Sequence, residues 1–189
     1  MSETTLYVKN MVCDRCKMAV DKTLRQVGLE PVEVDLGVVR VAGVPGESQL
    51  AQLREGLEAL GFELLDNRRL QTIEQIKAGI IKLVHYLDNQ TSLNLSGFLQ
   101  QELHQDYSTL SKLFSEYTSK TIERYYIEQR IERVKELLTY DEKTLTEIAL
   151  QMNYSSVAYL SSQFKSVTGM TPSQFKTLRR QGRKGLDTI

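Results

Sequence analysis

Apolar and polar positions over residues 5–65 follow two different periods. A period of two, typical of strands, predicts a strand over residues 5–10 and a two-stranded hairpin around Gly37. A helical period of about 3.6 residues predicts one helix between Cys16 and Gly28 and a second helix further on. The expected fold class is therefore α+β, a ferredoxin-like βαββαβ domain followed by helices. The hairpin strands are expected over 31–36 and 38–42, the second helix over 47–60 and the last strand over 61–65. The apolar positions of the two helices are Met18, Ala19, Val20, Leu24, Val27, Leu50, Leu53, Leu57 and Leu60.

A single apolar stripe runs along residues 67–90 and predicts one long helix. The simpler interpretation is a helix that packs into the core of the helical part. The alternative is a helix that also forms a dimer seam and transmits the state of the N-terminal domain. Because no Gly/Ser/Pro linker separates residues 62–66 from this helix, we expect the two parts to be coupled. The stripe consists of Ile73, Ile76, Ile80, Val84 and Leu87, widened by Ile81 and Leu83.

The C-terminal part of the chain has the pattern of a helix-turn-helix followed by a third helix. Apolar residues at i, i+3, i+4 and i+7 predict a helix over 145–152, and Asn153–Tyr154 supplies a tight polar turn. A second helix is expected over about 156–167, with Gly169 as its C-cap and Thr171–Pro172 as the start of the next helix. Such a pair of short helices suits the DNA major groove. The inward residues are expected to be Leu145, Ile148, Ala149, Met152, Tyr159, Leu160, Phe164 and Val167.

The same arrangement occurs once more upstream. It predicts helices over 95–103 and 107–117 around a polar turn at 104–106. Residues 121–138 are rich in Glu, Arg, Lys and Leu and predict a strong helix that joins the two units. We expect the side chains of Ser96, Thr144 and Thr171 to cap three helices whose N-terminal N–H groups meet phosphates. The apolar side of the joining helix consists of Tyr125, Ile127, Ile131, Val134, Leu137 and Leu138.

Several of these residues carry a resemblance to a known family. The Ile148–Ala149 pair, the serine-rich run from Tyr154 and the Gly-Met-Thr-Pro of 169–172 are similar to the second helix-turn-helix of AraC/XylS-type transcription regulators. Leu110–Phe114 resembles that family's Leu-Ser-Arg-Leu-Phe segment, and Arg130–Ile131 resembles the start of its joining-helix signature. The resemblance implies a double helix-turn-helix domain that binds double-stranded DNA. An ordinary amphipathic hairpin is the alternative.

The resemblance also places the residues that would face DNA. Lys112 stands at the family's usual Arg position, where it can donate to guanine or to phosphate. Ser162 stands where the family commonly has Arg, so the second unit is expected to rely on thymine methyl groups and phosphates. A solvated helix face is the alternative for each serine. The implied DNA-facing set is Tyr107, Ser108, Ser111, Lys112, Ser115, Val157, Ala158, Ser161, Ser162, Lys165, Arg179 and Arg180, and Arg183 and Lys184 extend its basic tail.

A Met-x-Cys-x-x-Cys sequence links the first expected strand to the first expected helix. Two thiolates three positions apart at a helix N-terminus can converge on one soft ion, and that position lowers the pKa of a thiol. Sulfur ligands favour Cu(I) or Zn(II) over hard cations. The order of elements around Cys13 and Cys16 resembles the heavy-metal-associated domain, which implies that both cysteines bind metal and that Met11 packs beneath the loop. The sequence departs from that family at Asn10, where Gly is usual.

Other interpretations of the cysteine pair stay open. It is also typical of a redox dithiol or thiol sensor, and it can be silent, with the domain kept as a partner surface. A disulfide framework does not fit a chain with two cysteines and no signal peptide. The small loop leaves room for a second ligand pair from another molecule, which would give a metal-bridged homodimer.

Charge and composition agree with a cytoplasmic protein that contacts DNA through its C-terminal part. Residues 1–66 hold seven Lys or Arg against eleven Asp or Glu, a balance of −4, whereas residues 67–189 have a balance of +4. No run is long and apolar enough to span a membrane. His85 and His104 are isolated, and there is no Gly-rich phosphate loop, so an enzyme is not expected.

The sequence therefore predicts a transcription regulator that responds to Cu(I) or Zn(II) held by Cys13 and Cys16. Its expected parts are a metal-binding domain over 1–66, a connecting helix over 67–90 and a DNA-binding domain over 91–189. The expected partners are double-stranded DNA, RNA polymerase and a second copy of the chain, joined through the metal or through a helix. The alternative is a metal-trafficking, storage or thiol-redox module whose helical half is a docking platform.

Overall fold

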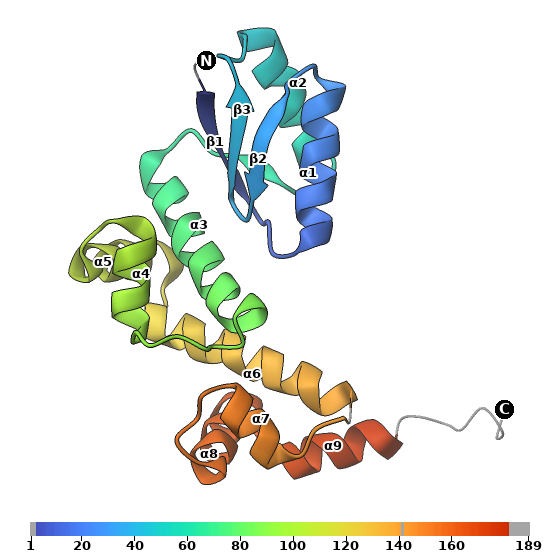
Figure 1. Cartoon of the computed structure of the whole chain (residues 1–189), viewed down its shortest axis with the longest axis vertical. Helices are drawn as coiled ribbons and strands as arrows, with labels where there is room; N and C mark the ends of the chain where they lie inside the picture. Colours follow the sequence, from blue (N-terminus) through green and yellow to red (C-terminus); the bar gives the residue numbers. More distant parts are fainter. Residues whose placement is uncertain (1–2, 141, 182–189) are drawn as a thin grey trace, which may run out of the picture. The chain divides into compact units, whose positions relative to one another are not determined.

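The computed structural model describes residues 3–140 and 142–181 and contains a small antiparallel sheet followed by a helical part, as expected (Figure 1). The described residues form two compact units. One comprises residues 3–79 with 99–117, and the other comprises residues 80–98 with 118–140 and 142–181. No helix within the described ranges combines the length and the apolar character needed to cross a membrane.

The sheet of the first unit has four strands in the spatial order β2-β3-β1-β4. Neighbouring strands are antiparallel, and Leu6 of β1 lies opposite Val39 of β3. Gly37 joins β2 to β3 with a φ of 74°, a left-handed conformation that glycine adopts without a Cβ clash. The strands are β1 (Glu3–Lys9), β2 (Pro31–Asp35), β3 (Val38–Ala42) and β4 (Glu63–Leu64).

Two helices, α1 (Asp14–Gln26) and α2 (Glu47–Glu58), contact each other and the sheet. Of the nine apolar positions predicted for these helices, four are buried (Val20, Leu24, Leu53 and Leu57) and three are half-buried (Ala19, Val27 and Leu50). Met18 and Leu60 are 71% and 54% exposed, so they do not belong to the buried apolar side. Met18 lies two residues before the buried Val20, about 200° around the helix, and Leu60 lies beyond the end of α2. The core consists of Val8, Met11, Val20, Leu24, Leu29, Leu36, Val39, Val41, Leu53, Leu57, Leu64 and Leu65.

The predicted long helix over 67–90 ends earlier than expected. The α-helix α3 (Arg68–Ile81) continues as a π-helix, η1 (Lys82–Tyr86), and the chain then turns through left-handed residues Asp88 and Asn89. Periodicity did not reveal this ending because the apolar stripe continues through Val84, which is buried, to Leu87, which is 39% exposed.

The start of α3 is bonded to the sheet domain within the first unit. The amide of Gln71 donates to the carbonyl oxygen of Leu65 over 2.8 Å. The backbone N–H of Asn10 lies 3.5 Å from a carboxylate oxygen of Glu74, with which it makes a long hydrogen bond. These contacts join the sheet domain to the start of this helix.

The remaining helices have nearly the predicted bounds. Gly169 caps α8 with a φ of 80°, and the Thr144 and Thr171 side chains cap α7 and α9 as predicted. The predicted cap at Ser96 was wrong, because Asn94 accepts the N–H of Gly97 over 2.8 Å one position before the helix begins. These helices are α4 (Leu95–Leu103), α5 (Tyr107–Thr118), α6 (Ile122–Tyr140), α7 (Leu145–Gln151), α8 (Val157–Thr168) and α9 (Pro172–Gln181).

Candidate nucleic-acid interface and thiol pair

The second helix-turn-helix consists of α7, a short turn and α8. Asn153 has a φ of 54°, which ends α7, and the N–H of Tyr154 bonds back to the carbonyl of Ala149 over 2.8 Å. The side chain of Ser156 then accepts the N–H of Tyr159 over 3.0 Å and caps α8. The two helices are fixed by their buried side chains, Ile148, Ala149, Met152, Leu160 and Phe164.

The outer face of α8 combines small apolar, hydroxyl and basic groups. Ala158, Ser162 and Lys165 are exposed, whereas Val157 and Ser161 are half-buried. Lys165 is the only charged residue of this helix. Tyr159 was predicted to face inward, but it is 51% exposed, and its ring packs edge-on against Tyr154 at 5.9 Å.

The first helix-turn-helix places its candidate residues on α5. Lys112 and Ser108 are exposed, and Tyr107, Ser111 and Ser115 are half-buried. The carboxylate of Asp106 accepts hydrogen bonds from the backbone N–H of Ser108 over 3.1 Å and from its hydroxyl. The Ser108 hydroxyl is the main reason that the pKa of Asp106 lies below its ordinary value. Ser108 therefore contributes to a helix cap, a role that its place on the exposed face did not reveal.

The basic residues at the C-terminus are only partly described. Arg179 and Arg180 belong to α9, but their side chains lie outside the described set, and Arg183 and Lys184 lie outside the described residues altogether.

Arg130 of α6 is a buried residue that sequence reasoning assigned only to a family signature. Its guanidinium donates to the carbonyl oxygen of Met152 over 2.7 Å and lies over the ring of Tyr154. No separate sequence signal marked this role, because an arginine in a charged helix is ordinarily exposed.

Cys13 and Cys16 lie together at the start of α1. Their sulfur atoms are 3.4 Å apart, both thiols are free, and both residues are half-buried. The backbone N–H of Cys16, followed by its side chain, lowers the pKa of Cys13 from its ordinary value. Met11 is buried, as predicted. Among the described residues, no group of three or more His, Cys, Asp or Glu side chains is arranged to hold a metal ion.

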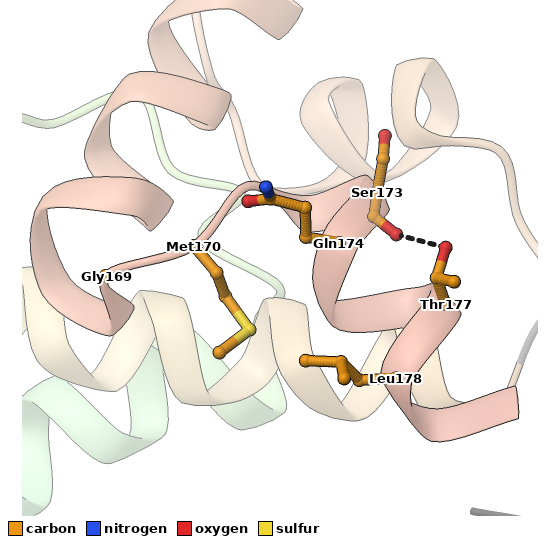
Figure 2. A pocket seen from close by; sticks show the side chains of 6 residues that line it. All are labelled: Gly169, Met170, Ser173, Gln174, Thr177 and Leu178. Atoms are coloured by element: carbon orange, nitrogen blue, oxygen red, sulfur yellow. Dashed lines mark hydrogen bonds between the residues drawn. The ribbon is translucent and has the colours of Figure 1, made fainter. Parts of the chain in front are cut away.

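A shallow groove of about 550 Å³ lies between the end of α8 and α9 (Figure 2). Met170 and Leu178 supply apolar atoms, while the hydroxyl of Thr177 is already bonded to the carbonyl of Ser173 over 3.0 Å. None of the described residues that line the groove is acidic or basic. Its lining residues are Gly169, Met170, Ser173, Gln174, Thr177 and Leu178.

Comparison with known families finds a match to the helix-turn-helix domain family over residues 99–178. The HTH-type transcriptional regulator ArgR of Pseudomonas aeruginosa is 30% identical over 73 residues, which cover 39% of this chain and 22% of that protein. An uncharacterized HTH-type transcriptional regulator of Staphylococcus aureus is 30% identical over 121 residues, which cover 51% of this chain and 16% of that protein. The chain thus spans about a fifth of these relatives.

Solved structures resemble the helical part. A DNA-binding transcriptional dual regulator of Escherichia coli superimposes with a TM-score of 0.50 and 20% identity over 57% of this chain and 94% of that chain. The DNA-binding domain of AdpA, solved with a target DNA, gives a TM-score of 0.50 and 18% identity over 58% and 96% of the two chains. The C-terminal half therefore contains a helix-turn-helix domain, and its fold resembles that of these two solved DNA-binding proteins.

Proposed function

We propose that this protein is a sequence-specific DNA-binding transcription regulator of AraC/XylS type that acts in the cytoplasm. The match of residues 99–178 to the helix-turn-helix family carries the proposal. Two further points support it. Each helix-turn-helix exposes the outer face of its second helix, α5 or α8. The relatives are named as transcriptional regulators.

In this proposal α5 and α8 each enter a major groove and read bases with their outer side chains. Lys112 and Lys165 would donate to guanine or to phosphate oxygens. Val157 and Ala158 would contact thymine methyl groups, since the face that they form carries no strong donor pair. The N-termini of α7 and α9, capped by Thr144 and Thr171, would lie near phosphates.

Selection from a random duplex library tests this function. We expect the reduced 189-residue protein to enrich one sequence pattern. The double variant Lys112→Ala, Lys165→Ala should bind that pattern more weakly and with a smaller salt dependence. Glu142→Ala in the exposed loop before α7 is the control and should leave the enriched pattern unchanged. Absence of any enriched sequence for the wild type would contradict the proposed function.

We also propose that the N-terminal domain is a ferredoxin-like, heavy-metal-associated type of domain that makes the regulator respond to Cu(I) or Zn(II). The order of strands and helices and the strand order β2-β3-β1-β4 support the fold assignment. The free thiols of Cys13 and Cys16 support the metal assignment, because two thiolates at a helix N-terminus suit a soft cation.

The geometry of the two sulfur atoms fits such an ion. Two sulfurs bound at about 2.3 Å with a tetrahedral angle would lie roughly 3.8 Å apart, close to the observed 3.4 Å. The described His, Cys, Asp and Glu residues form no group of three that could hold a metal ion. A second pair of ligands from another molecule would complete the site and give a metal-bridged homodimer. Bound metal would neutralise thiolate charge beside the start of α1 and so affect the packing of that helix.

Library enrichment with and without Cu(I) or Zn(II) tests the response. We expect site occupancy to change with metal in the wild type and to be indifferent to metal in the double variant Cys13→Ser, Cys16→Ser. Sedimentation of both proteins would show whether metal also forms a dimer. If site occupancy in the wild type does not change with metal, the proposed metal response is contradicted, while the proposed DNA binding is not. Regulation of transcription would further require contact with RNA polymerase, which in vitro transcription from the selected site measures.

A further inference from the structure

The segment that follows η1 has an unusual backbone. Asp88 and Asn89 have φ values of 46° and 61°, so two successive non-glycine residues are left-handed. Such conformations persist where surrounding contacts over-determine them. The segment also follows five residues of π-helix, a form found frequently at functional sites. The backbone conformation of residues 82–90 therefore indicates a role beyond that of connecting α3 to α4.

The side chains of this segment hold the end of α7. Asn89 is 4% exposed, and its amide nitrogen Nδ2 donates to the carbonyl oxygen of Met152 over 3.2 Å. Gln90 donates from Nε2 to the carbonyl oxygen of Gln151 over 2.6 Å. Carbonyl groups at a helix C-terminus lack partners within the helix. Two amides from about sixty residues upstream thus cap α7 at the point where the helix-turn-helix makes its turn.

Helix α6 fixes the same segment from the other side. The hydroxyl of Tyr126 donates to the side-chain oxygen of Asn89, so both ends of that amide are used. Arg133 bonds to the carboxylate of Asp88 over 3.1 Å. Arg130 donates to the carbonyl of Met152 that also accepts from Asn89. The turn therefore rests on residues 88–90 and α6 together, within one compact unit.

We propose that Asn89, assisted by Gln90, is a positioning residue for the second helix-turn-helix, so that the conformation of residues 82–90 sets how well α8 binds DNA. The inference rests on the proposed DNA-binding function. Asn89 acts through the carbonyl of Met152, and the turn that follows leads to Val157, where α8 begins. A shift of that carbonyl would move the start of α8, whose N-terminal residues are those that reach base edges.

Two variants of Asn89 distinguish the role of its side chain from the role of its left-handed backbone. Asn89→Asp keeps the size and the oxygen that accepts from Tyr126, but it replaces the donor with an oxygen facing the Met152 carbonyl. Asn89→Gly keeps a residue that tolerates the left-handed backbone and removes the whole side chain. Ile131→Val is the matched control, because it lowers the stability of the same unit from a fully buried site on α6.

The experiment compares the wild-type chain with these variants by the sequences that each enriches from a random duplex library and by their melting temperatures. A Ser162→Arg variant identifies the base positions read by α8, since only those should change preference. We expect Asn89→Asp to weaken binding to the selected site about tenfold and to flatten base preference at the α8 positions while preference elsewhere persists. Ile131→Val should lose about as much melting temperature as Asn89→Asp but keep its base preference both at the α8 positions and elsewhere.

Two results would overturn the inference. Asn89 variants that retain wild-type preference at the α8 positions would show that the amide does not position α8. Loss of base preference at all positions, together with a loss of melting temperature, would show a structural role only. If the wild type enriches no sequence, the proposed function itself fails, and that outcome is distinct from both.

Discussion

The guanidinium carbon of Arg130 lies 3.7 Å from the centre of the Tyr154 ring. The same group donates to the carbonyl of Met152, while its Nε has no hydrogen-bond partner among the described residues. Arg130 is 7% exposed and Tyr154 is 6% exposed, so the cation and the ring are both removed from water. In such surroundings a cation–π contact is stronger than at the surface. The pair joins α6 to the turn between α7 and α8.

Arg130→Ala should therefore destabilise the protein by about 3 kcal/mol, since it removes the ring contact and a charged hydrogen bond to a buried carbonyl. Guanidinium denaturation followed by far-UV circular dichroism measures the change. Arg124→Ala, on the same helix, is the control. Arg124 makes an exposed ion pair with Glu128, and its loss should cost less than about 0.5 kcal/mol. Equal costs for the two variants would contradict the assigned role of Arg130.

A second prediction concerns the contact between α1 and α2. A Cβ atom added at Gly56 would lie 2.9 Å from Cγ2 of Thr23, which is too close. Thr23 cannot easily move, because it is β-branched and its hydroxyl donates to the carbonyl of Ala19 over 2.9 Å. We expect Gly56→Ala to lower stability by about 1 kcal/mol, with overpacking exceeding the gain in helix propensity.

The companion substitution Thr23→Ser should turn the effect of Gly56→Ala on stability from a loss into a gain. Serine lacks Cγ2, so the added Cβ at residue 56 meets no atom there, and the helix propensity of alanine then dominates. In the Thr23→Ser background, Gly56→Ala should therefore raise the melting temperature. A loss of the same size in both backgrounds would show that the close contact is not the cause.

Sequence reasoning succeeded where a single residue type determines local geometry. Gly169 and Thr171–Pro172 were placed correctly because left-handed caps and helix starts have strong residue preferences. It failed at Tyr159, since a large aromatic residue near a helix start is compatible with either side until packing is known. It also missed the end of α3, where an apolar stripe continues across the change to a π-helix.

The network around Arg130 and Asn89 was beyond prediction for a different reason. Both residues are polar and are therefore ordinarily exposed. Their burial follows from hydrogen bonds to backbone carbonyls more than twenty residues away in the sequence. Periodicity reports which side chains are apolar, but it does not report which carbonyl groups are left without partners in the folded state. The cysteine pair, by contrast, was recognisable from sequence because its spacing alone brings the two sulfurs together.

A pH dependence is expected from the cap of α7. The carboxylate of Glu147 accepts the backbone N–H and the hydroxyl of Thr144, both over 2.7 Å, and the backbone bond is the larger cause of its lowered pKa. A carboxyl group whose pKa is depressed on folding stabilises the fold above its ordinary pKa and loses that contribution as pH falls through the folded value. Wild type should thus exceed Glu147→Gln in stability at neutral pH, and the difference should shrink below about pH 4.3.

Urea denaturation of both proteins between neutral pH and pH 3 measures this difference. Glu142→Gln, in the exposed loop before α7, makes the same change of charge outside the cap and serves as the control. A gap between wild type and Glu147→Gln that stays constant with pH would mean that the ionised carboxylate does not stabilise the cap.

A last prediction concerns DNA reading by α8. Ser162 is exposed, and Lys165 is the only charged residue of the helix, so this face lacks the paired donors that bind guanine bidentately. Ser162→Arg should add a guanine preference of about tenfold at one base position, since one such contact contributes about 1–3 kcal/mol. Thr146→Arg adds the same charge on the exposed side of α7, outside the recognition helix. It should raise affinity for all duplexes without changing base preference, because phosphate contacts carry no sequence information. Competition binding with duplexes that differ at single positions distinguishes the two effects. If Ser162→Arg raises affinity for all duplexes equally, as expected for Thr146→Arg, α8 does not read bases.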